Sequence, residues 1–176
     1  MNDAEDLFAL RSNPDAMKYI DKPLAKSASD IEELIKRIED GVNENASITW
    51  GITFHEMKQL IGTIGFHRIE KEHFRAEIGY MILPEFWNKG ITGEAIKRIL
   101  DFGFNEMQLH SIEARVNPGN RTSMHLLGKN NFVKEAHFHE SYFFDGKFLD
   151  TAVFSLLSHR HKYRRLKTSL PTPDIL

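Results

Sequence analysis

The chain has 176 residues, of which 41% are hydrophobic and 27% charged, and its formal net charge is −2. This size and composition are ordinary for one globular domain that buries its own core, and the nearly balanced charge argues against a nucleic-acid binder. The sequence has no cysteine, which excludes disulfides, thiolate metal sites and covalent catalysis by a thiol. Its acidic beginning, MNDAEDLFAL, lacks the apolar core of an export signal, and no apolar run approaches the length of a membrane span. We therefore expect a cytoplasmic protein.

The first part of the chain is predicted to be helical. Apolar residues recur at helical spacing over residues 3–13 until Asn13-Pro14 interrupts them, and residues 15–20 add a short helical turn. A second amphipathic helix is expected over residues 30–42, with Ser29 as its N-cap and Glu32 as the capping-box partner.

Three strands follow, because the apolar pattern changes to runs rich in β-branched and aromatic residues at 46–55, 60–70 and 73–83. Their short connections predict an antiparallel meander. Gly79, inside the third run, indicates either a bulge or a close approach of another group to the backbone.

Helices and strands then alternate: a helix over 90–107, a strand over 110–116, a helix over 122–130, and a hairpin formed by 132–144 and 148–157. Asp145-Gly146 favours a tight hairpin turn, and Asn130-Asn131 ends the preceding helix because asparagine tolerates the left-handed conformation. The predicted class is α+β. We expect one domain over residues 1–158 and a basic, irregular tail over 159–176.

The segment PEFWNKGITGEAIKR, residues 84–98, brings Gly90 and Gly93 to the start of a helix, although glycine is a poor helix former. One explanation is structural: Gly90 makes a tight turn and Gly93 lets the helix pack closely. The other is that the backbone approaches an anion such as a phosphate, held by unpaired N–H groups at the positive end of the helix dipole. Neither a dinucleotide-binding G-x-G-x-x-G nor a Walker lysine motif is present.

Two longer segments, AEIGYMILPEFWNKGITGEAIKRILDFGF and IEARVNPGNRTSMHLLGKNNFVKEA, resemble the GNAT superfamily of N-acetyltransferases, and within it the RimJ/RimL-like branch of ribosomal-protein N-terminal acetyltransferases. The resemblance extends over residues 48–157. It implies the GNAT acyl-CoA N-acyltransferase fold, a central twisted, mostly antiparallel sheet flanked by helices, with acetyl-CoA as co-substrate in a V-shaped gap beside the third strand. The strand with which the family normally begins has no counterpart in this sequence, so we expect one strand fewer at that edge of the sheet.

The resemblance also assigns the cofactor site. The acetyl-CoA motif of the family falls on residues 87–92, with Trp87 where arginine or glutamine is frequent and Thr92 where glycine or alanine is usual. Asn120 and Ser123 match the family's Asn-x-x-Ser, in which the asparagine contacts the pantetheine arm. Residues 81–83 are expected to pair with pantetheine as an added strand. The predicted cofactor-binding residues are Met81, Ile82, Leu83, Lys89, Gly90, Ile91, Thr92, Gly93, Glu94, Asn120 and Ser123.

Glu77 is the predicted general base, since an α-amino group has a pKa of about 8 and must lose a proton before it attacks. The alternatives are a solvent-facing Glu77 paired with Arg75 or Lys71, and a water chain as the base. A backbone N–H near Ile82 is the predicted donor to the oxyanion. Without cysteine, we expect direct attack in a ternary complex.

Ser123 or Tyr142 is predicted to protonate the departing thiolate. Each has a structural alternative. Ser123 is also suited to the first turn of a helix, and Tyr142 is an ordinary aromatic residue of a strand.

The predicted acceptor is a primary amine, either a protein N-terminus or a small amine such as a polyamine, an amino acid or an aminoglycoside. Two rival functions are a non-catalytic acyl-CoA-binding or regulatory module and a nucleic-acid-associated protein that uses the basic tail. The hydrophobic last strand permits a homodimer. Metal binding is not expected, because the pairs His137/His139 and His159/His161 have no carboxylate or cysteine at ligand spacing.

Overall fold

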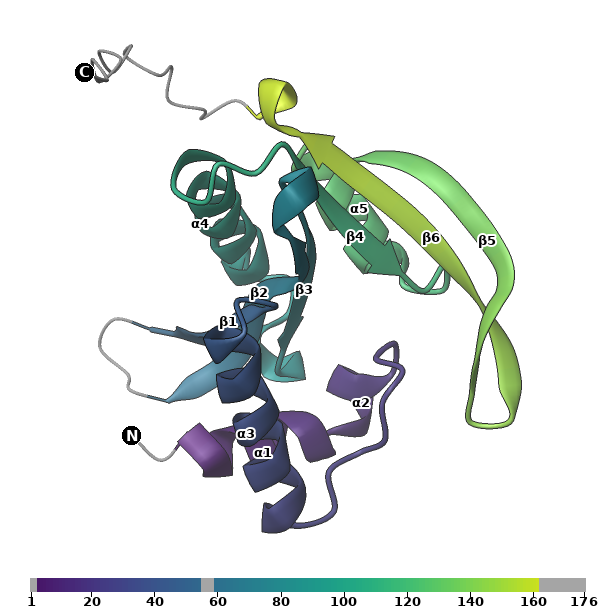
Figure 1. Ribbon diagram of the computed structural model, residues 1–176. Helices are drawn as coiled ribbons and strands as arrows, with labels where there is room; N and C mark the ends of the chain where they lie inside the picture. Colours follow the sequence, from purple (N-terminus) through teal and green to yellow (C-terminus); the bar gives the residue numbers. More distant parts are fainter. Residues whose placement is uncertain (1–2, 55–58, 162–176) are drawn as a thin grey trace, which may run out of the picture.

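The computed structural model describes residues 3–54 and 59–161 (Figure 1). Its helices are α1 Asp3–Ser12, α2 Pro14–Met17, α3 Ala28–Asn43, α4 Ile91–Asn105 and α5 Arg121–Lys129. Its strands are β1 Ile48–Thr53, β2 Leu60–Glu70, β3 Arg75–Ile82, β4 Ser111–Val116, β5 Val133–Phe144 and β6 Lys147–Leu157. Short 3₁₀ turns are η1 Lys71–His73, η2 Pro84–Phe86 and η3 Ser158–Arg160. The predicted order of helices and strands is confirmed.

The strands form one six-stranded sheet in the order β1-β2-β3-β4-β6-β5. The first three strands make the predicted antiparallel meander, β3 and β4 are parallel, and β4, β6 and β5 are antiparallel. The sheet is therefore mostly antiparallel, as predicted, and the parallel β3–β4 pair makes it mixed. Within the described residues no strand precedes β1, which lies at one edge.

Helices cover both faces of the sheet (Figure 1). α4 and α5 pack on one face over the main core, which includes the fully buried Phe66 and Leu127. α1, α2 and α3 pack on the other face around a smaller core that contains Leu10 and Met81. Because strand side chains alternate between faces, β3 contributes Ile82 to the first core and its neighbour Met81 to the second. None of the helices in the described part of the chain is long and apolar enough to cross a membrane.

The sheet opens between β3 and β4. These parallel strands pair at only three positions, the last of which joins Glu77 to Glu113. Beyond that point β3 continues to Ile82 and β4 to Val116, but the two strands no longer pair with each other and separate (Figure 1). This unpaired half of the junction is the V-shaped gap that the sequence predicted beside the third strand.

The start of α3 differs from the prediction. Its N-cap is Ser27, not Ser29, and the capping box is completed by Asp30, not Glu32. The Asp30 N–H donates to the Ser27 hydroxyl, and the Asp30 carboxylate accepts from the N–H groups of Ser27 (3.0 Å) and Lys26 (2.7 Å). Either serine satisfies the sequence rule, and the path of the incoming chain at Lys26 decides between them.

Two predicted left-handed positions, the end of α5 and the β5–β6 turn, are confirmed. Asn131 has a φ of 65° at the end of α5, and Asp145-Gly146 has φ values of 47° and 76° in the β5–β6 turn. Gly79 lies opposite Gly65 in regular register, without a bulge. A Cβ atom on Gly79 would lie 3.0 Å from the imidazole ring of His67, so the close-approach explanation is the right one.

The described fold continues past residue 158. His161 is only 7% exposed; its Nε2 lies 2.8 Å from Oδ1 of Asp101, and its ring packs 5.0 Å from that of Phe104, both on α4. His159 lies in η3 and His161 is its C-cap, so neither belongs to a strand. The rest of the predicted basic tail lies outside the described residues.

Candidate active site

The loop before α4 leaves backbone amides open. Asn88 and Gly90 both have positive φ values, 57° and 82°, and Gly90 is the N-cap of α4 without any side-chain hydrogen bond to the first turn. The indole Nε1 of Trp87 donates to the carbonyl of Ile82 (3.0 Å) and ties the loop to the end of β3. A helix whose first amides have no cap presents partial positive charge at that end, which suits an anion.

The two glycines of this loop have different physical reasons. Gly90 needs its positive φ, which other residues adopt only with strain. A Cβ atom on Gly93 would meet only Cδ1 of Leu126, at 3.5 Å, which is ordinary contact. Close packing therefore does not require glycine at position 93, and the structural explanation raised by the sequence fails there.

The remaining predicted residues of this helix start surround the same amides. Ile91, Thr92 and Gly93 are half-buried, whereas Lys89 and Glu94 are exposed. The Lys89 ammonium lies 5.5 Å from the centre of the Phe86 ring, a cation–π distance. Among the described residues no carboxylate forms an ion pair with it, so its charge is available to an anion at the helix start.

Backbone alternation decides which groups of β3 face the gap. The N–H of Leu83 donates to the carbonyl of Ile61 (2.9 Å), which directs Leu83 toward β2. In an antiparallel pair the backbone groups of successive residues point to opposite sides. The backbone N–H and C=O of Met81 therefore also point to β2, and those of Ile82 point into the gap. Of the three predicted pantetheine partners, Ile82 is therefore the residue that presents its N–H, while its carbonyl accepts from Trp87.

Across the gap, α5 begins with Asn120 as its N-cap. The Asn120 Oδ1 accepts from the N–H of Ser123 (3.0 Å), and the Ser123 hydroxyl lies 2.8 Å from that of Tyr80. Burial raises the pKa of Tyr80 to about 12, with the hydrogen bond to Ser123 acting in the opposite direction. Sequence reasoning missed Tyr80. Its only signal was its place beside residues 81–83, because its partner lies 43 positions away.

Glu77 lies near the closed end of the gap, with its side chain 21% exposed. Its Oε2 is 3.0 Å from Nη1 of Arg68 and 3.6 Å from Nε of Arg115, and neither contact has hydrogen-bond geometry. Burial raises the pKa of Glu77 above its ordinary value, and the two arginines oppose that shift. The predicted structural partners, Arg75 and Lys71, do not pair with it.

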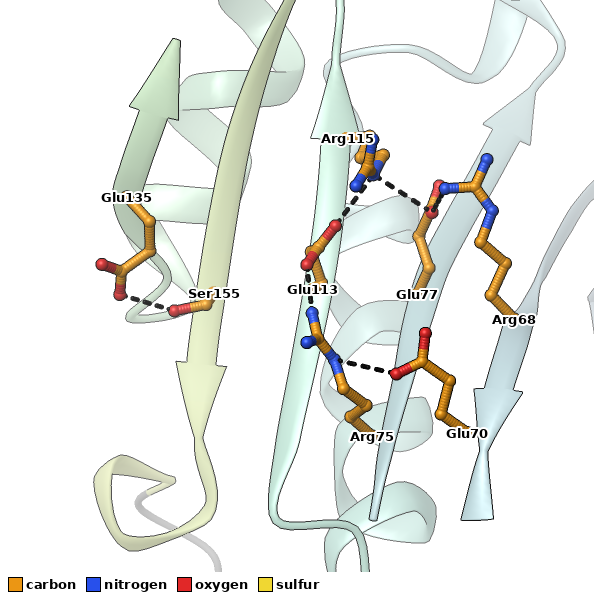
Figure 2. A network of polar contacts seen from close by, with 8 residues as sticks. All are labelled: Arg68, Glu70, Arg75, Glu77, Glu113, Arg115, Glu135 and Ser155. Carbon is orange, nitrogen blue, oxygen red and sulfur yellow. Dashed lines mark hydrogen bonds and ion pairs between the residues drawn. The ribbon is translucent and has the colours of Figure 1, made fainter. Parts of the chain in front are cut away.

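Figure 2 shows that Arg75 contacts other carboxylates, in an ion-pair network across β2, β3 and β4. Arg75 lies 3.6 Å from Glu70 and pairs with Glu113, and Glu113 also accepts from Arg115 (2.8 Å). The contacts of Arg75 lie where β3 and β4 are still paired, and Arg115 lies two residues beyond the last paired position. The ion pairs of Arg75 thus lie over the paired half of the β3–β4 junction, and the unpaired half is open to a ligand.

A cavity of about 640 Å³ lies on the α1–α3 side of the gap and includes Glu77 and Tyr142 in its lining. The Tyr142 hydroxyl is buried and makes no hydrogen bond of normal geometry. Burial and the nearby Asp21 raise the pKa of Tyr142, and Asn117 lowers it. Of the three predicted catalytic residues, Glu77 and Tyr142 thus share one cavity, and Ser123 adjoins it through Tyr80, another lining residue.

Histidines gather away from the gap. The rings of His137 and His139 stack at 4.5 Å, and both lie within hydrogen-bond distance of Oδ2 of Asp150, at 2.7 and 3.1 Å. The expectation that no carboxylate lies at ligand spacing from these histidines is wrong, since one ligand atom from each of His137, His139 and Asp150 lies within 4.8 Å of the other two. Asp150 also accepts from the N–H of Glu140 (2.9 Å), so the cluster fixes the irregular segment of β5.

A mixed sheet splayed between two parallel strands, with an uncapped helix start beside the opening, is the architecture of an acyl-CoA-dependent N-acyltransferase. The model of the acetyltransferase (GNAT) domain family matches residues 1–133. The chain therefore belongs to the GNAT acetyltransferase family.

Individual relatives agree with this assignment. An uncharacterized N-acetyltransferase of Bacillus subtilis, YoaA, is 37% identical over 158 residues, which cover 90% of this chain and 89% of that protein. The crystal structure of spermidine N-acetyltransferase from Vibrio cholerae in complex with CoA and spermine superimposes with a TM-score of 0.79 at 28% identity and covers 90% of this chain and 91% of that chain. A putative ribosomal N-acetyltransferase of Bacillus subtilis, YdaF, is 30% identical over 98 residues, 56% of this chain and 54% of that protein.

These comparisons make the chain an acetyl-CoA-dependent N-acetyltransferase with the GNAT fold. The narrower RimJ/RimL-like branch has weaker support, because the ribosomal relative matches little more than half of the chain. The relatives include spermidine acetyltransferases as well, so the acceptor is a separate question.

Proposed function

We propose that the protein transfers the acetyl group of acetyl-CoA to a primary amine by direct attack in a ternary complex. The observation that carries the proposal is the juxtaposition of an uncapped helix start, an unpaired strand edge and a cavity with a half-buried carboxylate. In the reaction a C–N bond forms and the thioester C–S bond breaks. One proton leaves the amine and one is taken up by the thiolate.

The cofactor's diphosphate is proposed to bind the backbone amides from Ile91 to Gly93, with the Lys89 ammonium adding charge. The N–H of Glu94 already donates to the carbonyl of Gly90 (3.1 Å).

The pantetheine arm is proposed to pair with the free N–H of Ile82 and to carry the thioester along β3 toward Glu77. Ile82 lies five residues from Glu77, about 16 Å along the strand, so the predicted oxyanion donor at Ile82 is not part of this proposal. Asn120 uses its side-chain oxygen to cap α5, so its amide NH₂ is the group available to pantetheine.

Glu77 is proposed as the group that takes the amine proton, directly or through a water molecule. Burial raises its pKa and with it its proton affinity, while Arg68 and Arg115 favour the ionised form. Two hydroxyl groups are candidates for protonating the thiolate. Ser123 is hydrogen-bonded to Tyr80, and Tyr142 holds an unbonded hydroxyl in the cavity.

The test compares Glu77→Gln with Glu70→Gln, a matched control because Glu70 belongs to the same ion-pair network but does not line the cavity. We expect kcat/KM for the best amine of a panel to fall about 100-fold in Glu77→Gln and to change little in Glu70→Gln. The affinity for CoA, measured by calorimetry, should be the same in both variants. Release of free CoA thiol gives the rate.

The competing function is a non-catalytic acyl-CoA-binding module. Binding of CoA without turnover on any protein N-terminus or small amine would favour it and remove the catalytic proposal. Equal activity of Glu77→Gln and the wild type would leave the transfer reaction intact but assign the base to a water chain.

A further inference from the structure

A guanidinium group from α1 reaches the same cavity. Arg11, the penultimate residue of α1, lines it together with Glu77 and Tyr142. The Arg11 Nη1 lies 3.7 Å from Sδ of Met17 and 3.7 Å from Sδ of Met81. Thioether sulfur is a weak acceptor, so neither contact compensates a positive charge.

No carboxylate in the described parts of the chain forms an ion pair with Arg11, whose side-chain hydrogen bonds there are the two to sulfur. Burial lowers the pKa of Arg11, and the nearby Arg37 lowers it further. A desolvated cation without an anion is costly to the fold. Residues 3–54 and 59–161 therefore leave this charge without a counter-ion.

The residues that line the cavity carry a net positive charge, like Arg11 itself. Its charged lining residues are four cations, Arg11, Lys22, Arg68 and Arg115, and two acids, Asp21 and Glu77. Glu77 is already shared by two of those arginines. A polyamine presents only positive charges and would meet repulsion at Arg11, whereas an acceptor with a negative group would meet a partner.

The geometry of β3 sets the separation of the two ends. Glu77 and Met81 lie on the same face of the strand, four residues apart, which is about 13 Å along an extended chain. Arg11 contacts Met81 at one end of this face. Between Met81 and Glu77, the His67 ring lies over Gly79. A ligand that reaches from the carboxylate of Glu77 toward the guanidinium of Arg11 therefore needs several bonds between its charged ends.

Building on the acetyl transfer proposed above, we propose that the acceptor is a small amine that also carries a carboxylate, and that Arg11 binds this carboxylate. A guanidinium matches a carboxylate with two parallel hydrogen bonds, and Glu77 receives the amine at the other end. The chemical class is an ω-amino acid or a short peptide with a free C-terminus. Arg11 is then a specificity residue for the acceptor and makes no contact with CoA.

The test uses ω-amino acids of three to six carbons and diglycine, each against its uncharged amide, together with spermidine. We expect the wild type to prefer the best acid over its amide by about ten-fold or more in kcat/KM. In Arg11→Met this preference should disappear through a higher KM for the acid, with kcat and CoA affinity retained. Arg11→Lys should keep part of it, and Arg160→Met, an exposed control on η3, should keep all of it.

Thermal unfolding separates this role from a structural one. Arg11→Met should not lower the melting temperature, because methionine fills similar space and removes an uncompensated charge. A preference for spermidine in the wild type, or an acid-to-amide ratio that is unchanged in Arg11→Met, would overturn the proposal.

If no amine at all is acetylated, the transfer reaction fails as a proposal, but anion binding is still testable. The probe is N-acetyl-6-aminohexanoate, titrated into the CoA-loaded wild type and into CoA-loaded Arg11→Met. Weaker binding to Arg11→Met would support the carboxylate site, and equal affinity would exclude it.

Discussion

The starts of α3 and α4 belong to amphipathic helices of similar length, 16 and 15 residues, yet they treat their first amides differently. At α3, Ser27 and Asp30 form a complete capping box. At α4, Gly90 has a left-handed backbone and no side chain caps the first turn. The difference shows that the chain satisfies the helix start that only supports the fold and leaves open the one beside the gap between β3 and β4.

The largest effect is expected from a negative charge at the open start. Thr92→Glu should lower the affinity for CoA on the order of 100-fold, because a carboxylate would lie next to the proposed diphosphate. The fold itself should be unharmed, since an acid in the first turn stabilises a helix by about 0.3–1 kcal/mol. Calorimetry with CoA and thermal unfolding measure the two effects.

The matched control places the same acid on the capped helix. Ser29→Glu, in the exposed first turn of α3, should leave CoA affinity unchanged. Equal CoA affinities for Thr92→Glu and the wild type would contradict the assignment of the diphosphate to α4.

The next effect comes from a methyl group at the second glycine. Gly93→Ala should weaken CoA binding about ten-fold by covering the amides, while the better helix propensity of alanine adds up to about 1 kcal/mol of stability. The structure has room for that methyl group beside Leu126. Gly128→Ala, on the surface of α5, is the control: it should stabilise the fold without any change in CoA affinity.

A smaller effect is expected at the third helix start. Asn120→Asp keeps the oxygen that caps α5 but removes the NH₂ donor proposed for pantetheine. The affinity for CoA should fall by roughly three- to ten-fold with no loss of thermal stability. Loss of stability without a change in affinity would make Asn120 a capping residue alone.

The smallest functional effect belongs to the cap of α3. Ser27→Ala should cost about 1 kcal/mol of stability and lower the melting temperature by about 2–4 °C. CoA affinity and kcat should stay at wild-type values. A large loss of CoA affinity in this variant would show that the two helix starts are not independent.

Local chemistry explains what the sequence could predict. The order of helices and strands, the Asp145-Gly146 turn and the end of α5 at Asn131 depend on neighbouring residues, and all are confirmed. The choice between Ser27 and Ser29 as N-cap was missed because both satisfy the same local rule.

The contacts between distant segments could not be predicted from spacing. Tyr80 meets Ser123 across 43 positions, and Arg11 meets Met81 across 70. Glu77 was found through the family resemblance, but its arginine partners were not, since strand register decides which side chains become neighbours. The anion-binding subsite proposed at Arg11 therefore had no signal in the sequence.

Because β3 and β4 pair at only three positions, amide exchange along β3 should report whether a ligand occupies the gap. Backbone N–H groups in the three paired positions are shielded whether or not the gap is filled, whereas that of Ile82 points away from β2 toward the gap. Hydrogen–deuterium exchange at Ile82 should thus be fast in the free enzyme and slow down when a ligand completes the strand edge. One strand then contains both the signal and its internal reference.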